Sequence, residues 1–169
     1  MTEPSAPRMH RIDYHPPELD KQKVFGRSGL AHLQAMAAGE IPAPPISAHI
    51  GLGIVSVTEG DVVMTAEPHE SHYNPIGSVH GGFFAILLDS VCGCAVHSTL
   101  PAGVGYTTLE LKVSFLRGIT ADTGTVTAHG WVTKPGRSAA FAEGDIRDSD
   151  GRVLATASST LLVMGPAGA

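Results

Sequence analysis

One acidic residue interrupts the most apolar segment of the chain. Residues 81–98 contain no proline and are apolar nearly all round, which is typical of a helix buried in a core. Asp89 lies within this segment next to Leu88, and a buried carboxylate without a partner is costly. Asp89 therefore either pairs with a nearby amide or hydroxyl group and organises the core, or serves as a base or nucleophile. The segment alone leaves both interpretations open.

Two glycines at the start of this segment provide a second group that could do chemistry. Gly81 and Gly82 leave the first amides of the expected helix sterically open. Those N–H groups have no partner within the helix and lie at the positive end of its dipole, so they can bind an anion or a developing oxyanion. Glycines at this place can also simply allow close packing. Their combination with an interior acid favours the catalytic interpretation.

The spacing of these groups predicts a site shared by two chains. Asp89 follows Gly82 by seven residues, so both lie on one face of the helix, with a rise of about 10 Å between them. That separation is too large for both groups of one chain to flank the same carbonyl. If two copies pair with these helices antiparallel, each Asp89 meets the helix start of the other copy. The chemistry therefore favours a homodimer with two interfacial sites.

A longer pattern surrounds these groups. The run from Asn74 to Gly82 reads N-P-I-G-S-V-H-G-G, and Asp89 completes an N-x5-H-G-G-x6-D spacing. In this pattern and in the segment 106–117, the chain resembles hotdog-fold thioesterases of the phenylacetate-pathway PaaI type over residues 28–164. The resemblance implies an α+β fold in which an antiparallel β-sheet wraps around one long central α-helix. It also implies dimers with active sites across the interface, which often pair into tetramers.

The same resemblance implies an enzyme that hydrolyses acyl-CoA thioesters to the free acid and CoA. Asp89 corresponds to the nucleophile or general base, and the amide of Gly81 or Gly82 to the group that polarises the thioester carbonyl. A general base contributes about 10²–10⁴-fold and an oxyanion donor about 10²–10³-fold to the rate. Because the thiolate is a good leaving group, these two groups suffice, and we expect no metal or redox cofactor.

Three further residues are implied to position the reactants. His80 and Asn74 correspond to residues that position the loop, the substrate or water. Thr108 corresponds to a hydroxyl residue that helps to hold the attacking water. Together with the acid and the glycines, they make up the expected catalytic set.

Candidate contacts to the phosphates of CoA come from the basic residues. Lys134 and Arg137 flank a Pro-Gly turn, which is either a solvated hairpin tip or, as in relatives, a turn that contacts CoA. Ser138 and Arg117 are weaker candidates for the same role. The acyl group itself is not determined by these residues, and an aryl or short-to-medium acyl group is only implied by the resemblance.

Other residues that could bind metal are better explained as structural. His69, Glu70 and His72 lie in a polar loop and match no helical metal motif, so we expect no metal site. Cys92 and Cys94 are the only cysteines, and two thiols cannot complete a closed zinc site. We interpret both as reduced core residues.

The pattern of breakers and apolar residues divides the chain into three parts. We expect a polar leader over residues 1–27, a helix and proline-rich connector over 28–45, and a hotdog thioesterase domain over 46–169. Ser28 and Gly39 have the residue types that start and stop a helix. The expected antiparallel strands are 50–58, 61–66, 108–115, 123–134, 137–147 and 152–164, the first two joined at Glu59-Gly60. In the strand 108–115 apolar and polar residues alternate, so the apolar ones are expected to face the core: Leu109, Leu111, Val113 and Phe115.

Composition excludes several classes of function. A net charge of −5 without a basic stripe argues against nucleic-acid binding. No apolar run reaches the roughly 18 residues of a membrane span, and the N-terminus lacks the pattern of a signal peptide. We therefore expect a cytoplasmic protein whose partners are acyl-CoA and further copies of itself, with no membrane partner.

Two alternatives remain on the same fold. An acyl-CoA hydratase or dehydratase would favour an Asp/His dyad in another loop context, which the sequence lacks. A non-catalytic acyl-CoA-binding or regulatory module would not need a buried carboxylate at the carbonyl.

Overall fold

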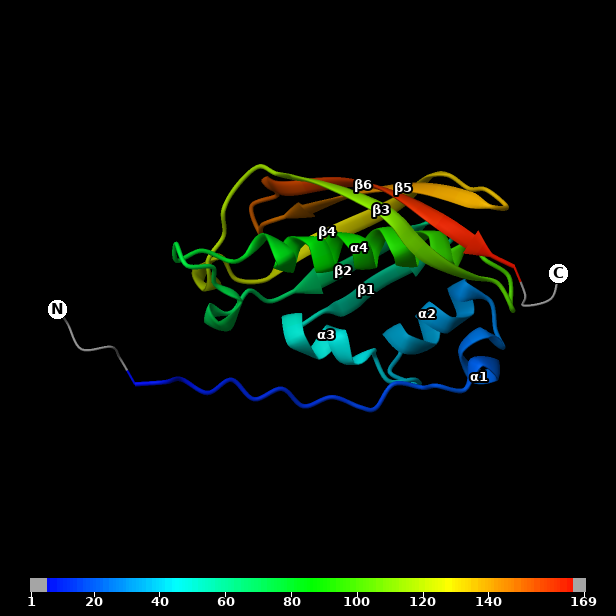
Figure 1. The fold of residues 1–169 in the computed structure, drawn as a ribbon, viewed down its shortest axis with the longest axis horizontal. Coiled ribbons are helices and arrows are strands. Elements are labelled where there is room, and N and C mark those ends of the chain that lie inside the picture. Colours follow the sequence, from blue (N-terminus) through cyan, green and yellow to red (C-terminus); the bar gives the residue numbers. More distant parts are fainter. Residues whose placement is uncertain (1–5, 166–169) are drawn as a thin grey trace.

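The computed structural model describes residues 6–165, in which six antiparallel strands curve around one long helix, as expected (Figure 1). The strand order is β1-β2-β4-β5-β6-β3, so β1 and β3 are the two edges of the sheet. The strands are β1 (Gly53–Thr58), β2 (Asp61–Ala66), β3 (Gly105–Phe115), β4 (Val126–Lys134), β5 (Ala139–Arg147) and β6 (Val153–Met164). The helices are α1 (Lys21–Phe25), α2 (Gly29–Ala37), α3 (Pro45–Ile50) and α4 (Gly81–Ser98), with 3-10 turns at Glu70–His72 and Ala121–Thr123.

The central helix α4 has the bounds that the sequence predicts, and the sheet encloses most of it. Leu87, Leu88 and Val91 are completely buried. The helix approaches β4 so closely that a Cβ atom on Gly130 would lie 2.5 Å from the backbone carbonyl of Val91. Glycine at this place is therefore required by contact between backbones, and the register of α4 against the sheet is fixed.

By length and mean hydropathy alone, α4 could cross a membrane, contrary to the expectation that no apolar run of the chain is long enough. The helix is the core element of the domain, with 56% of these residues buried inside the structure. Its apolar character is accounted for by the sheet around it. The described part of the chain contains no second helix of this kind.

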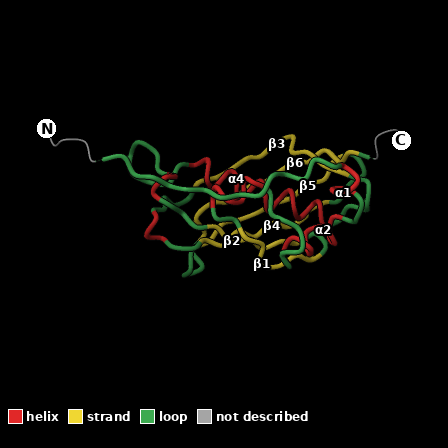
Figure 2. Tube along the Cα trace, turned by 90° about the horizontal axis from the view of Figure 1, so that it is seen from below, coloured by secondary structure: helices red, strands yellow, loops and turns green. Residues whose placement is uncertain are grey.

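The elements outside the sheet agree with the sequence at several points. Ser28 caps α2 by accepting a hydrogen bond from the N–H of Ala31 at 3.3 Å. Gly39 follows the helix with a φ of 74°, and Gly60 turns the β1–β2 hairpin with a φ of 77°. Residues 6–20 have no regular structure and run along the length of the molecule to α1 (Figures 1 and 2).

Three local predictions are wrong. The connector predicted to end at Pro45 instead ends one residue earlier, because Pro45 is the first residue of α3. Proline is well tolerated at the first position of a helix, where its missing N–H would have no partner. Ile50, predicted to begin a strand, ends α3, and β1 starts at Gly53. The segment before β4 forms the turn Ala121–Thr123 rather than the start of the strand.

The predicted alternation of β3 is also wrong at Leu109 and at Phe115, which is 56% exposed, and the error at Leu109 has a functional consequence. Thr108 pairs with Leu161 of β6, but Glu110 pairs with Thr160, so Leu109 is an extra residue in a β-bulge. Leu109, predicted to face the core, is 60% exposed. The bulge shifts the alternation by one residue and turns Thr108 towards α4.

The two cysteines and His97 belong to the interior. Cys92 and Cys94 are free thiols, as expected, and burial together with the charge of Asp89 raises the pKa of each to about 12. His97 packs edge to face on His32 of α2, with ring centroids 5.8 Å apart. The Nδ1 atoms of both rings are buried without a hydrogen-bond partner among the described residues. Burial, and to a smaller extent His32, lower the pKa of His97 to about 4.

We expect the protein to lose stability between pH 6.5 and pH 4. The folded state resists protonation of His97, whereas the unfolded chain takes up the proton near pH 6.5, so the free energy of unfolding falls as the pH falls through this window. The loss should be about 3 kcal/mol. Urea denaturation at a series of pH values measures it. His97→Phe keeps a ring beside His32 but cannot be protonated, and an equally steep pH dependence in that variant would contradict the assignment.

Candidate active site

The loop before α4 is organised by Asn74. Its Oδ1 accepts hydrogen bonds from the N–H groups of Ile76 and Ser78 at 3.0 and 3.2 Å. Its Nδ2 donates to Oγ of Ser78 at 3.0 Å. All the polar atoms of this side chain are therefore used within the loop. The structure supports the part of the expected role that concerns the shape of the loop.

In the first turn of α4, one backbone N–H group has no hydrogen-bond acceptor among the described residues. His80 is the N-cap, and its Nδ1 accepts the N–H of Gly82 at 2.9 Å. The ring packs so closely that a Cβ atom on Gly82 would lie 3.0 Å from Nδ1. The N–H of Gly81 has no such acceptor within residues 6–165. Of the two glycine amides that the sequence left open, only that of Gly81 is therefore available to a substrate.

The available amide lies in a small hollow at the N-terminal end of α4. The hollow has a volume of about 340 Å³, and its walls include Phe84, Phe115 and Arg117. The ring of Phe115 covers Gly81, where a Cβ atom would lie 3.2 Å from Cζ. The sequence analysis did not place Phe115 at this site, because nothing in an aromatic residue at a strand end indicates where its ring will pack.

The bulge in β3 brings Thr108 to Asp89. Oγ1 of Thr108 donates a hydrogen bond of 2.8 Å to Oδ1 of Asp89, which is half-buried on α4. Among the described residues Asp89 has no ion-pair partner, and Oδ2 accepts no hydrogen bond that would occupy it. The neighbouring Cys94 and Tyr106 stay neutral, because burial and the charge of Asp89 raise the pKa of each. The site therefore contains an anchored carboxylate whose charge is not neutralised.

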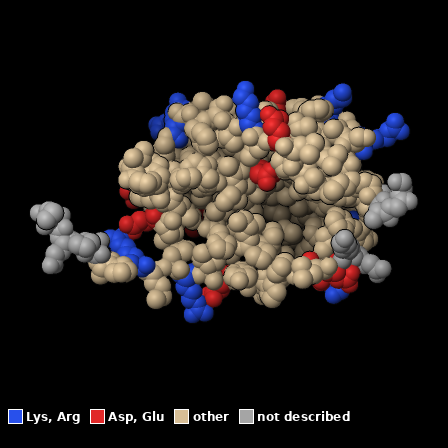
Figure 3. Space-filling model, viewed as in Figure 1, with Lys and Arg blue, Asp and Glu red and all other residues tan. Residues whose placement is uncertain are grey.

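Asp89 lies on a partly exposed face of α4, and Gly81 lies about two turns before it, turned by roughly 80° around the helix axis. This face includes Gly82, Ala85, Ile86, Asp89 and Ser90, none of which is fully buried. Figure 3 shows that this side of the molecule carries few charged side chains and is hollowed beside the helix. One chain thus presents both groups on an open surface, without a wall opposite them.

The candidate CoA contacts fall at opposite ends of α4. Arg137 lines a hollow of about 840 Å³ together with Thr99 and Pro101, which follow the C-terminal end of the helix. Lys134 ends β4 near this hollow, and the backbone carbonyl of Ser138 accepts the N–H of Val163 at 3.0 Å. Within one chain, these three residues are therefore not brought together with Gly81. Of the four candidates, only Arg117 lies beside Gly81.

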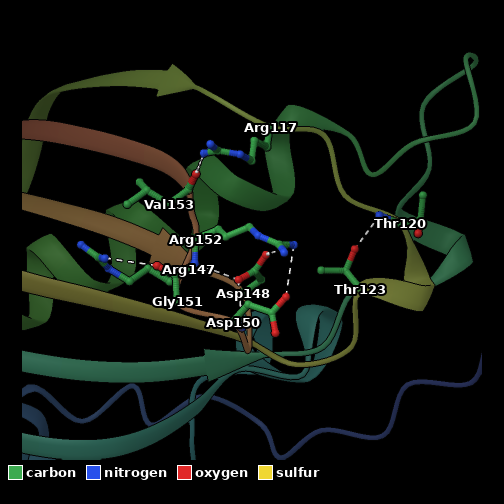
Figure 4. A network of polar contacts seen from close by, with 9 residues as sticks. All are labelled: Arg117, Thr120, Thr123, Arg147, Asp148, Asp150, Gly151, Arg152 and Val153. Carbon is green, nitrogen blue, oxygen red and sulfur yellow. Dashed lines mark hydrogen bonds and ion pairs between the residues drawn. The ribbon is translucent and has the colours of Figure 1, made fainter.

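Arg117 differs from the other arginines around the β5–β6 turn. In Figure 4, Arg152 lies between Asp148 and Asp150. The guanidinium of Arg147 forms an ion pair with Asp145, which the figure does not draw. Arg117 instead donates to the backbone carbonyl of Val153. It has no carboxylate partner among the described residues, so its charge is available to an anion.

The histidines of the polar loop have structural partners. Nδ1 of His69 accepts the N–H of Ser71 at 3.1 Å, and both ring nitrogens of His72 are hydrogen-bonded to backbone groups. In the described part of the chain, no group of three or more acidic, histidine or cysteine residues could hold a metal ion. The sequence did not indicate how many contacts His72 makes, since two of its partners are backbone atoms of other elements, in His49 and His80.

The curved sheet around a single helix, with an open amide at the helix start, defines the hotdog class of folds. A family profile described as the thioesterase superfamily matches residues 76–155. The chain is 30% identical to a provisionally named thioesterase, a phenylacetic acid degradation-related protein of Ralstonia eutropha JMP134, over 76% of this chain and 97% of that one, with a TM-score of 0.70. The chain therefore belongs to the thioesterase superfamily, and the PaaI-type resemblance is confirmed.

Two other relatives extend this comparison. A hypothetical thioesterase of Streptococcus pneumoniae TIGR4, solved with coenzyme A, is 28% identical over 68% of this chain and 90% of that one, with a TM-score of 0.62. A provisionally named esterase of Caenorhabditis elegans is 36% identical over 109 residues. The match covers 63% of that curated relative, so the chain spans less than two thirds of its length.

The role of the Gly81 amide can be tested with a matched pair of variants. Gly81→Pro removes the N–H group at a helix position that tolerates proline, and Gly81→Ala adds a similar Cβ but keeps the N–H. If this N–H donates to the oxyanion, Gly81→Pro should lower kcat by about 10²–10³-fold more than Gly81→Ala does. Steady-state thioester hydrolysis measures both. Equal losses would show that contact with Phe115, not the donor, is what matters.

The hydroxyl of Thr108 should matter for turnover more than for folding. Thr108→Val removes a hydrogen bond to a charged group while keeping the shape of the side chain, so kcat should fall about tenfold or more. Thr108→Ser keeps the hydroxyl and should retain most of the activity. Similar kcat values for the valine and serine variants would exclude a role for the hydroxyl.

Proposed function

We propose that the protein hydrolyses acyl-CoA thioesters, with Asp89 acting on a carbonyl that the Gly81 amide polarises. The observation that carries the proposal is the pair formed by an unneutralised, anchored carboxylate and a free amide at a helix N-terminus. Membership of the thioesterase superfamily and the coenzyme A held by the pneumococcal relative support the choice of substrate.

In the proposed reaction, the N–H of Gly81 donates to the thioester oxygen as negative charge develops there. Asp89 takes a proton from a water molecule held with Thr108, and the water oxygen bonds to the carbonyl carbon. The C–S bond then breaks, and CoA leaves as the thiolate. Direct attack by Asp89 would instead form a mixed anhydride, which water then cleaves. Both routes consume one water and give the free acid and CoA, without a metal or redox cofactor.

The site is completed in this proposal by a second copy of the chain. Within one helix, Gly81 and Asp89 are separated by about two turns, or roughly 12 Å, which is too far for one carbonyl to contact both. The open face of α4 lies beside β3, an edge strand whose outer backbone groups need a partner. Antiparallel pairing of two α4 helices would bring each Asp89 to the partner's amide, giving two sites in a homodimer, which could pair further into a tetramer.

Arg117 is the proposed contact for the phosphates of CoA at the same helix start. It borders the hollow that contains Gly81 and lacks a carboxylate partner in the described chain. The other three candidates lie at the opposite end of α4: Lys134, Arg137 and Ser138. They could contact CoA only in a site whose carbonyl-binding groups come from the partner chain.

Mixing two inactive variants tests both the chemistry and the dimer. Asp89→Asn should lower kcat by about 10²–10⁴-fold while the protein stays folded and dimeric. When Asp89→Asn and Gly81→Pro subunits are exchanged, a heterodimer regains one intact site, so about a quarter of all sites should recover. Thiol release from an acyl-CoA panel and sizing of the oligomer measure the two parts.

The outcome separates the alternatives. Activity in the Asp89→Asn variant close to that of the wild type would refute the catalytic role. Loss of activity without recovery in the mixture would place both groups in one chain. Binding of acyl-CoA without release of thiol would favour a non-catalytic binding module, and addition of water to an enoyl-CoA without free CoA would favour a hydratase.

A further inference from the structure

His72 connects three segments around the start of α4, although it belongs to none of the groups in the proposed reaction. We infer that His72 is a positioning residue, which fixes the turn that presents the Gly81 amide. The inference rests on the proposed function, because it concerns the donor of that site. The hydrogen bonds of His72 support the inference, because they connect α3, the turn Glu70–His72 and the start of α4 in series.

The side chain of His72 joins the turn Glu70–His72 to α3. Nδ1 accepts the N–H of His69 at 3.0 Å, and Nε2 lies 2.8 Å from the carbonyl oxygen of His49 in the last turn of α3. Since a carbonyl can only accept, Nε2 carries the proton and Nδ1 the lone pair. Both ring nitrogens are thus committed to backbone groups, and the ring has a single functional orientation.

The backbone of His72 connects the turn to the start of α4. Its carbonyl oxygen accepts the N–H of His80 at 2.8 Å. His80 in turn accepts the N–H of Gly82 through its ring, and its carbonyl accepts the N–H of Phe83 at 3.0 Å. Gly81 lies between these anchored residues, so the direction of its free N–H depends on where His80 is held.

Packing keeps the ring in place from the other side. The ring of His72 lies against Phe83, which is 4% exposed, with ring centroids 5.2 Å apart. By contrast, the exposed side chain of Glu70 on the same turn forms an ion pair with Arg8 of the leader. The turn is therefore attached to the core through His72 and to the leader through Glu70. A substitution of Glu70 can thus serve as a control for a substitution of His72.

The expected effect of releasing His72 is kinetic. An oxyanion donor acts through a preorganised position, and a misplacement of about 1 Å can cost about 10²-fold in rate. Substrate binding depends on contacts along the whole CoA molecule and should change little. Loss of the connection to α3 should therefore lower kcat and leave KM nearly unchanged.

A set of substitutions separates the contributions of the side chain. His72→Phe keeps the ring against Phe83 and removes both hydrogen bonds, and we expect kcat to fall about tenfold or more with KM within about twofold. His72→Gln can restore the donor to the carbonyl of His49, and it should recover most of kcat. Glu70→Ala on the same turn should behave as the wild type. Thermal unfolding of each variant shows whether it is fully folded at the assay temperature.

A second measurement follows the Gly81 amide directly. In a ¹⁵N–¹H spectrum, the Gly81 resonance should shift in His72→Phe and return towards the wild-type position in His72→Gln. Wild-type kcat and an unmoved Gly81 resonance in His72→Phe would overturn the inference, as would equal losses in Glu70→Ala. If the wild-type protein hydrolyses no acyl-CoA, the proposed function fails, whereas the resonance still decides whether His72 positions the amide.

Discussion

The close packing of α4 against β4 sets the position of every group in the candidate site. Backbone meets backbone where Gly130 lies over Val91, so the helix can neither slide nor rotate without a clash. The face opposite this contact carries Asp89, and the N-terminal turn carries Gly81. The buried core around α4 holds the helix that carries both groups, and the Thr108 hydroxyl adds a contact to Asp89. A rigid helix of this kind can hold an acid and an amide at a constant separation.

The carboxylate on this helix requires a compensating contact, and the sheet supplies it through an irregularity. A regular β3 would direct Thr108 outward and Leu109 to the core. The extra residue at Leu109 reverses this, so that Thr108 donates to Asp89 and a leucine is left 60% exposed. The exposed leucine is the unfavourable consequence of the bulge, and the hydrogen bond from the Thr108 hydroxyl to the acid is the favourable one. Asp89 is thus paired with a hydroxyl and still has an available oxygen, and its role as base or nucleophile stays a prediction.

The sequence predicted the regular parts of the fold because their signals are local. The bounds of α4 follow from two glycines and a long, proline-free, mostly apolar segment, and the cap at Ser28 and the turn at Gly60 follow from residue type. The prediction failed where one residue type is common in two kinds of local structure. Pro45 was interpreted as part of an extended connector, whereas proline also begins helices, as it does in α3.

By itself, the sequence determined the fold class, the family resemblance and the identity of the acid and the glycines, because these depend on residue types and fixed spacings along one helix. Only the tertiary structure decided which groups are available and which are committed. His80 occupies the Gly82 amide, leaving that of Gly81, and Arg117 rather than Arg137 lies beside it. The physical reason is that hydrogen bonds and hollows form between segments far apart in the chain, and their partners leave no periodic trace in the sequence.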